Sequence, residues 1–418
     1  MHLYLTKPGD TLAGVAMRHR VTPQQLITCN PLPRSPFLLP GHMLIIPSQL
    51  AAAGTEGYHT CQVKPDDTLR RVSARTGVPL TLISLCNELS DERITPGEFL
   101  LIPDTLTRST VSKKQLGLLS FSPLLLPDGT AGPLTYLGAQ GLRIDAAGNV
   151  QVPSAAKPGP DDSNLRQLFL CTLDGAAQIL PDVAKALLRS DDAKLRILDQ
   201  LALALKPAGG DGVIFDWPAM RREDEVPYLQ LVKEAGRRLR PMGYRVGLYL
   251  SSASPLCKRT SLLAEVSRGI DHVFFEAVPS GRHASPPPPL VGTEDTRLAL
   301  QQALESLPPE QLWLVQRPAA VYAERGRAVH RITPHAAIEL AYLHGSPLLR
   351  DSATDLAWFR CPNREGGHSV WLEDMKSFVR KLEILENMKL QGLALWEVGA
   401  YFPEAWRYLY DEYETLNE

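Results

Sequence analysis

From about residue 111 the chain alternates between short apolar runs and longer stretches whose apolar residues have helical spacing. Short apolar runs that alternate with helical stretches are typical of strands connected by helices. Eight runs are expected as strands: Leu116–Phe121, Leu134–Leu137, Leu168–Leu173, Gly212–Asp216, Arg245–Leu250, His272–Val278, Leu312–Gln316 and Gly392–Trp396. Six stretches are expected as helices: Pro181–Leu188, Asp192–Leu205, Glu223–Leu239, Ser261–Arg268, Asp295–Glu305 and Trp371–Met388. A small hairpin is expected at Leu142–Val150. This pattern predicts an α/β protein with a (β/α)8 barrel over residues 111–418.

An internal repeat precedes the predicted barrel. Lys7-Pro-Gly-Asp-Thr-Leu12 recurs as Lys64-Pro-Asp-Asp-Thr-Leu69, and Cys29-Asn30 recurs as Cys86-Asn87. Leu39-Pro-Gly41 with Leu44-Ile-Ile-Pro47 recurs as Thr95-Pro-Gly97 with Leu100-Leu-Ile-Pro103. Each copy predicts a strand, a helix opened by a Thr or Asp cap, a second helix, a Pro-Gly turn and a final strand. Gly77 is a plausible C-cap, and the Ala- and Gly-rich linker Ser48–Gly57 predicts freedom between the copies.

The repeat resembles the LysM module, a small β-α-α-β fold that binds the N-acetylglucosamine backbone of peptidoglycan or chitin. We place the two modules at residues 1–48 and 58–104. The resemblance implies a sugar groove between the loop after the first strand and the loop before the last. The matching positions are Gly9, Asp10, Thr11, Pro40 and Gly41, then Asp66, Asp67, Thr68, Pro96 and Gly97. The alternative is that these Asp and Thr residues are only helix caps and the Pro-Gly pairs only turns.

Composition narrows the possible partners. The formal net charge is −2, so charge gives no reason to expect nucleic acid or an anionic membrane surface as a partner. No apolar run reaches the ~20 residues of a membrane-spanning helix, and the N-terminus lacks a signal-peptide pattern. The six cysteines form no Cys-x-x-Cys pair and the histidines lack ligand spacing, so we expect no metal, no cofactor and synthesis in a reducing cytoplasm.

The fourth predicted strand carries the most informative motif, Asp211-Gly-Val-Ile-Phe-Asp-Trp-Pro218. It resembles the Asp-Gly-x-Asp-x-Asp-x-Glu signature of the family 18 glycoside hydrolases, with Ile214 at the middle Asp and Pro218 at the catalytic Glu. Further segments resemble a bacterial branch of that family, the LysM-bearing spore cortex-lytic N-acetylglucosaminidases and germination proteins. These segments are Leu134–Leu137, Asp145–Gly148, Arg331–Ala337, Ser369–Asp374 and Gly392–Pro403. The branch implies location in the spore coat, spore cortex or cell wall.

The family resemblance implies a substrate-assisted reaction. A Glu protonates the glycosidic oxygen, and the N-acetyl carbonyl of the substrate attacks the anomeric carbon. Asp216 would orient the acetamide and Trp396 would form the pocket floor, while Val278 replaces a strand-six Tyr that hydrogen-bonds the acetamide. General acid catalysis contributes typically ~10²–10⁴-fold and an oxyanion-type donor a comparable factor. With Pro218 and Val278 at these two positions, we predict that the standard reaction is lost.

Other residues keep alternatives open. Glu276 is the first candidate for a relocated acid, with Asp174, Glu223, Glu225 and Glu397 behind it; Glu276 alternatively pairs with an arginine such as Arg282 or Arg317. Trp217, Trp396 and Tyr401 either stack on sugar or pack in the core. Asp211 and Asp216 remain as a catalytic remnant or as carboxylates that accept backbone N–H groups. Asp351, Glu373 and Asp374 are expected as loop and cap residues.

Three functions fit these observations. The first is a non-catalytic protein that binds peptidoglycan or another N-acetylglucosamine-containing glycan through its LysM modules. The second is an active N-acetylglucosaminidase on cortex peptidoglycan or chitin-type glycans, with Glu276 as the relocated acid. The third is a structural protein of the spore whose barrel mouth, near Pro286–Pro289, binds coat or cortex proteins.

Overall fold

The structure is a computed structural model of the 418-residue chain. It describes residues 1–30, 32, 37–47, 58–76, 83, 87, 89, 93–103, 114–122, 134–152, 166–218, 220–279, 290–323, 329–361, 368–396 and 403–415. The linker 48–57, Gly77, most of the second helix expected in the second module, and Arg282, Pro286–Pro289, Glu397 and Tyr401 lie outside the described residues.

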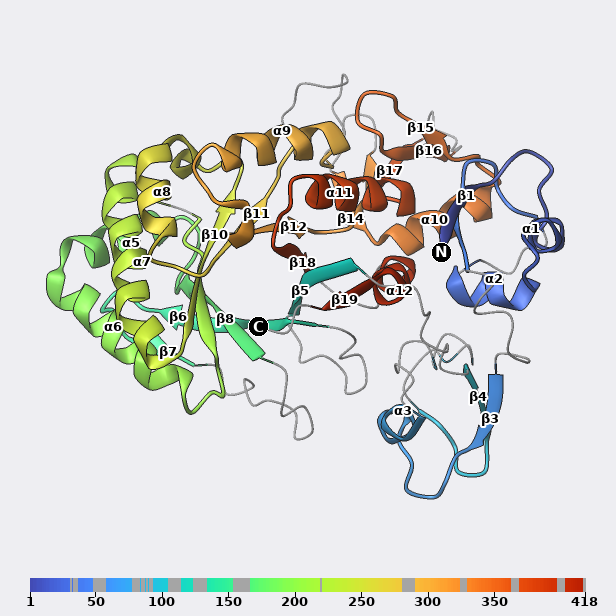
Figure 1. The fold of residues 1–418 in the computed structure, drawn as a ribbon, viewed down its shortest axis with the longest axis horizontal. Helices are drawn as coiled ribbons and strands as arrows, with labels where there is room; N and C mark the ends of the chain where they lie inside the picture. The colour runs from blue at the N-terminus through green and yellow to red at the C-terminus, as the bar shows by residue number, and fades with distance from the viewer. Residues whose placement is uncertain are drawn as a thin grey trace.

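Eight parallel strands close into a barrel (Figure 1). They are β5 (Lys114–Ser122), β6 (Tyr136–Ile144), β8 (Arg166–Leu173), β9 (Gly212–Phe215), β10 (Arg245–Ser251), β11 (His272–Glu276), β12 (Leu312–Gln316) and β18 (Gly392–Trp396). Neighbouring strands pair in this order, and β18 pairs with β5 to complete the ring. The predicted (β/α)8 barrel is therefore confirmed. The sixth strand ends at Glu276, two residues before the expected Val278.

Large side chains fill the barrel interior. Alternate residues of the strands point inward and form one cluster: Leu119, Phe121, Tyr136, Leu168, Leu170, Ile214, Tyr249, Phe274, Trp313, Val315 and Ala394, with Trp396 at its edge. Trp313 needs glycines beside it, because a Cβ on Gly117 or Gly392 would lie 2.6 Å from its indole ring. The interior is thus a packed core, and an open site has room only at the ends of the strands.

Helices surround the barrel (Figure 1). They are α5 (Leu180–Arg189), α6 (Asp191–Leu205), α7 (Glu225–Leu239), α8 (Thr260–Ser267), α9 (Thr293–Leu304), α11 (Met375–Asn387) and α12 (Pro403–Glu412), with short 3-10 turns at η2 (Arg222–Asp224), η3 (Arg240–Met242), η4 (Pro255–Lys258) and η5 (Pro309–Gln311). Ser190 caps α6 and Asp374 caps α11 by accepting backbone N–H groups, which satisfies donors that a helix start leaves unpaired. The cap role expected for Asp374 is thus confirmed.

An antiparallel sheet is inserted between β12 and α11. It contains β13 (Ala320–Ala323), β14 (Val329–Ile332), β15 (Leu349–Arg350), β16 (Ala357–Cys361) and β17 (His368–Leu372), in the order β14-β13-β17-β16-β15, and α10 (Pro334–His344) packs on it. This sheet was not expected. It corrects the helix predicted from Trp371, because Trp371 pairs with Trp358 across β16 and β17, and the helix begins only at Met375. The two short strands β7 (Val150–Gln151) and β19 (Tyr413–Thr415) extend the barrel sheet, and β7 closes the expected hairpin.

The two modules have related folds. The first contains β1 (His2–Leu5), α1 (Leu12–His19), α2 (Pro23–Cys29) and β2 (Met43–Ile46), and β1 pairs antiparallel with β2. The second contains β3 (Tyr58–Gln62), α3 (Leu69–Thr76) and β4 (Phe99–Pro103), and β3 pairs antiparallel with β4. The Thr11 hydroxyl accepts from Gly14 N in α1, as expected of a cap. In Figure 1 the first module lies beside α10, and the second stands apart from the barrel.

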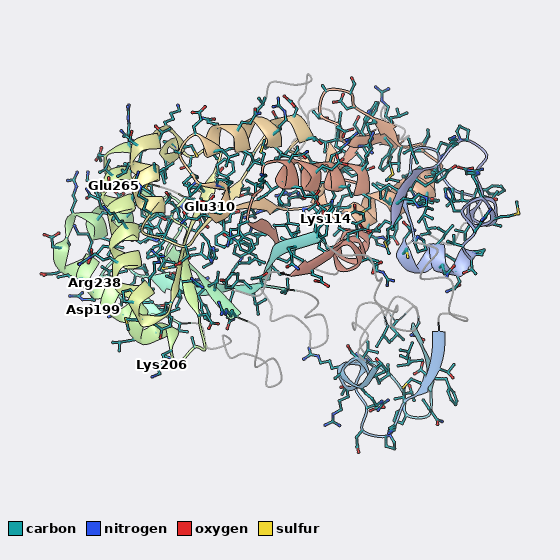
Figure 2. All side chains as sticks on the ribbon, viewed as in Figure 1. Lys114, Asp199, Lys206, Arg238, Glu265 and Glu310 are labelled. Carbon is teal, nitrogen blue, oxygen red and sulfur yellow. The ribbon has the colours of Figure 1, made fainter. Side chains whose placement is uncertain are left out.

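Charged residues cover the outer helices. Arg238 of α7 pairs with Asp199 of α6 at 3.0 Å, and both are labelled on the helical face in Figure 2. Exposed pairs of this kind contribute typically ~0.2–1 kcal/mol each. Among the described residues, no helix is both long enough and apolar enough to span a membrane.

Candidate functional site

The carboxyl ends of the barrel strands place five polar or aromatic side chains at one opening. Side chains of a strand alternate between its two faces, so the inward positions continue from the interior cluster. Asp216 follows inward Ile214 on β9, Glu276 follows Phe274 on β11, and Arg317 follows Val315 on β12. Tyr249 of β10 and Trp396 of β18 complete the set. We call these five residues the mouth cluster.

Two residues of the mouth cluster bind the carboxylate of Glu276. Its Oε1 lies 2.9 Å from Arg317 Nε, and its Oε2 accepts a hydrogen bond of 2.8 Å from the Tyr249 hydroxyl. The sequence predicted a relocated acid or a pairing with Arg282 or Arg317 for Glu276, and the structure has the pairing with Arg317. Tyr249 was not a candidate, although its inward position in β10 follows from strand alternation.

Trp396 is covered in part by the same arginine. The guanidinium carbon of Arg317 lies 4.0 Å from the ring centre of Trp396, and Phe121 stacks on that ring with centroids 4.8 Å apart. The indole N–H of Trp396 donates to the Tyr249 hydroxyl over 3.2 Å. A guanidinium at this distance is attracted to the ring by its quadrupole and occupies area that a stacked sugar needs.

Asp216 sits in an environment that favours its neutral form. Burial raises the pKa of Asp216 to about 6; the charge of Arg317 opposes the rise and the charge of Glu276 adds to it. A carboxyl with such a pKa exchanges its proton near neutral pH. Asp211, by contrast, lies at the other end of β9, where its carboxylate accepts a 2.7 Å hydrogen bond from Gln167 N. Asp211 therefore has the structural role left open for it and lies away from the mouth cluster.

The residues after Asp216 point in different directions. Trp217 is 3% exposed and packs on Tyr228 of α7 with ring centroids 5.1 Å apart. Of the two roles left open for Trp217, it therefore has core packing and not sugar stacking. Strand alternation explains this: Phe215 and Trp217 face the helices, whereas Asp216 faces the mouth. Pro218 is exposed, and Val278 is half-buried with its N–H donating to Ser252 Oγ at 2.9 Å.

The other candidate acids have partners outside the mouth cluster. Asp174 lies 3.5 Å from Arg143, Glu223 lies 3.3 Å from Lys185, and the buried Glu225 lies 2.8 Å from Arg259. Asp351 accepts from Thr354 in a loop, as expected, while Glu373 pairs with Lys381. Among these described candidates, only Glu276 is held by Arg317 and Tyr249 of the mouth cluster.

The loop after the first strand is held in the same way in both modules, whereas the turn before the last strand differs in exposure. In the first module Asp10 accepts from Lys7 N and pairs with Arg18 at 3.1 Å; in the second, Asp67 accepts from Lys64 N and pairs with Arg75 at 2.8 Å. These pairs fix the loop after the first strand in each module. Gly9, Asp66, Thr68, Pro96 and Gly97 are exposed, while Thr11, Pro40 and Gly41 are half-buried.

No metal site or disulfide appears in the described part of the chain. No group of three or more His, Cys, Asp or Glu residues there is arranged to hold a metal ion. Five of the described cysteines form no disulfide: Cys29, Cys61, Cys171, Cys257 and Cys361.

Comparison with known proteins agrees with this division of the chain. Residues 4–47 and 61–103 match the LysM domain family. This is therefore a LysM-containing protein with two such domains, and the rest of the chain has the barrel fold of family 18 glycoside hydrolases. The barrel aligns with a chitinase from Chromobacterium violaceum ATCC 12472 at a TM-score of 0.59 and 17% identity, over 71% of this chain and 98% of that one.

Several relatives match the chain over its whole length. The cortical fragment-lytic enzyme of Bacillus subtilis (strain 168) is 24% identical, and the match covers 100% of this chain and 99% of the relative. The crystal structure of the spore cortex-lytic enzyme SleL of Bacillus megaterium QM B1551 aligns at a TM-score of 0.74 and 21% identity, over 100% of this chain and 99% of that one. The chain is thus similar to spore cortex-lytic proteins in sequence and in fold over its whole length.

Proposed function

We propose that this protein binds peptidoglycan, or another N-acetylglucosamine-containing glycan, of the spore or cell wall without hydrolysing it by the substrate-assisted route. Pro218 stands where that route needs its general acid, and this is the observation that carries the proposal. The proline side chain has no proton to give, and its exposed position lies beyond the strand end. Without a donor at the glycosidic oxygen, the leaving group departs as an alkoxide, which costs ~10²–10⁴-fold in rate.

The mouth cluster supports the same conclusion. Glu276 is engaged by Arg317 and Tyr249, and Arg317 lies on the ring of Trp396. Both carboxylate oxygens of Glu276 are therefore already occupied by protein partners. Arg317 and Val278 also alter the space in which the acetamide and the sugar ring would have to sit.

The domain order supports a place in the wall. Two LysM domains precede the barrel, and the relatives that match the whole chain are named for spore cortex lysis. Deposition on the forespore by the mother cell is the route that we propose, with coat or cortex proteins as further partners.

The test uses the full chain and purified cortex peptidoglycan. We expect the protein to co-sediment with this material and to release no reducing ends or soluble muropeptides over prolonged incubation. Failure to co-sediment would refute glycan binding. Sustained product release would refute the loss of catalysis while leaving binding intact.

An active N-acetylglucosaminidase is the second candidate, favoured by one observation. Glu276 and Asp216 both lie at the barrel mouth, and Asp216 has a pKa of about 6. In this scheme Glu276 would donate the proton and Asp216 would stabilise the acetamide. Product release that disappears in Glu276→Gln but persists in Glu223→Gln, a surface carboxylate, would support it.

A further inference from the structure

The two LysM modules differ in how much of their surface the rest of the protein covers. The Pro-Gly turn before the last strand is Pro40-Gly41 in the first module and Pro96-Gly97 in the second. Pro96, Gly97 and the following Glu98 are exposed. Pro40 and Gly41 are half-buried, and the following His42 is only 5% exposed. One side of the first groove is therefore covered and the matching side of the second is open.

The cover over the first groove is the segment between α10 and β15. The N–H of Leu348 donates to the carbonyl of Pro40 over 2.9 Å. The carbonyl oxygen of Leu348 would lie 1.9 Å from a Cβ on Gly41, whereas a Cβ on Gly97 would meet nothing within 4 Å. Contact this close between backbones leaves no space for a sugar ring at the Gly41 turn.

Side chains of α10 fix the same contact. The hydroxyl of Tyr342 accepts from Leu39 N at 3.4 Å and lies 3.1 Å from His42 Nδ1, and the two rings meet edge to face at 5.7 Å. At the start of the module, the N-terminal ammonium of Met1 pairs with Glu412 of α12 at 2.6 Å. The module is thus held at several separate points.

The strand that follows the turn is buried on both faces. Leu44 and Ile46 belong to the core of the first module, whereas Met43 and Ile45 belong to the large cluster beneath the barrel helices. Phe99 has the position of Met43 in the second module and is 62% exposed. The outward face of the last strand is therefore a docking face in the first module and an open face in the second.

From these contacts we propose that the second LysM module carries glycan binding in this protein, and that the first module is a fixed part of the barrel body. The inference rests on the proposed glycan-binding function and assigns it to one module. A soluble N-acetylglucosamine tetramer should then occupy one site per chain, at the loops that contain Pro65 and Pro96. On a long glycan, the second module alone would then attach the barrel to the polymer.

The test is a pair of matched substitutions in the full chain. Pro8 and Pro65 are equivalent exposed residues on the loop after the first strand of each module, so a bulky side chain at either position obstructs only its own groove. By calorimetry with the tetramer, we expect Pro65→Trp to weaken binding at least tenfold and Pro8→Trp to change it less than twofold. Equal losses in the two variants, or two equivalent sites in the wild type, would overturn the assignment. If the wild type binds no tetramer and no peptidoglycan, the glycan-binding proposal itself fails.

A third variant tests the cause of the difference. Met43→Glu places a charge on the docking face at a position that the second module exposes, so the module can keep its fold while the docked state is disfavoured. We expect this variant to bind a second tetramer per chain, and Pro8→Trp in the same chain to remove the added site. Circular dichroism checks that the Met43→Glu variant is folded, and increased amide exchange at β2 shows that its first module is undocked. If such a variant still binds only one tetramer per chain, the segment between α10 and β15 is not what keeps glycan from the first module.

Discussion

Arg317 and Glu276 form an ion pair of 2.9 Å across the mouth of the barrel, and the same arginine lies 4.0 Å from the ring centre of Trp396. One side chain therefore restrains the carboxylate nearest the strand ends and also covers the expected sugar floor. Placing Glu at Pro218 and Tyr at Val278, as the family resemblance implies for these positions, does not remove this arginine.

Recovery of hydrolysis should require the removal of Arg317 in addition to substitutions at Pro218 and Val278. We expect Pro218→Glu with Val278→Tyr to hydrolyse N-acetylglucosamine oligomers weakly, and addition of Arg317→Ala to raise the rate about tenfold or more, because the acid and the ring floor then become usable together. Hydrolysis of defined oligomers, with wild type alongside, measures this. As a control, Arg143→Ala, which removes an exposed arginine, is added to the double variant in place of Arg317→Ala. Full activity in the double variant alone would show that Arg317 does not block the site.

Asp216 should make the folded protein less stable as the pH rises. Its folded pKa of about 6 lies above the usual 3.8, so between these values the folded state holds the proton more tightly. The protonated Asp216 carboxyl therefore adds to the free energy of unfolding. This contribution is fully present below about pH 4 and is lost as the pH rises through 6. Asp216→Asn should therefore stabilise the protein at pH 8 by up to about 3 kcal/mol and have little effect at pH 4. Denaturant titrations at both pH values measure this, and Asp199→Asn on the surface should show no such difference.

The two equivalent glycines should respond unequally to alanine. Gly41 and Gly97 have φ values of +84° and +92°, so the backbone strain of an alanine, about 1–2 kcal/mol, is common to both. Gly41→Ala must in addition displace the carbonyl of Leu348. We expect Gly41→Ala to increase amide exchange in β2 and α10, and Gly97→Ala to affect only its own module. Equal protection of β2 and α10 in both variants would contradict the docking contact.

Acid should loosen the docked module. Burial lowers the pKa of His42 to about 4; the charge of Asp374 partly opposes this and that of His335 adds to it. The neutral ring is thus required for docking, and the unfolded or undocked chain binds the proton more tightly between pH 6.5 and 4. Stability should fall over this window by up to about 3 kcal/mol. Protection factors at β2, which correct amide exchange for its intrinsic dependence on pH, should fall in wild type between pH 7.5 and 4.5 and should change less in His42→Gln. A fall of the same size in both would contradict this.

Much of the barrel could be predicted from the residues in order. Strands such as Leu312–Gln316 and Gly392–Trp396 are continuous apolar runs, since parallel strands are buried on both faces, and their bounds agree with the structure. The inserted sheet was missed because its strands are short and mixed in polarity. In β14, for example, Val329-His-Arg-Ile332 has only two apolar residues. Trp371 was assigned to a helix because the helical spacing of α11 continues back into β17.

The sequence by itself determined the two repeats, the barrel and the absence of an acid at Pro218, because these depend on local pattern and residue identity. Tertiary structure decided how Tyr249, Glu276 and Arg317 meet, since they come from three different strands. It also decided which module docks. The last strands of the two modules have nearly the same apolar sequence, Met43-Leu-Ile-Ile46 in one and Phe99-Leu-Leu-Ile102 in the other, so the local pattern does not tell them apart. Only the packing of β2 against the barrel distinguishes them, because burial by a distant segment leaves no mark in the local sequence.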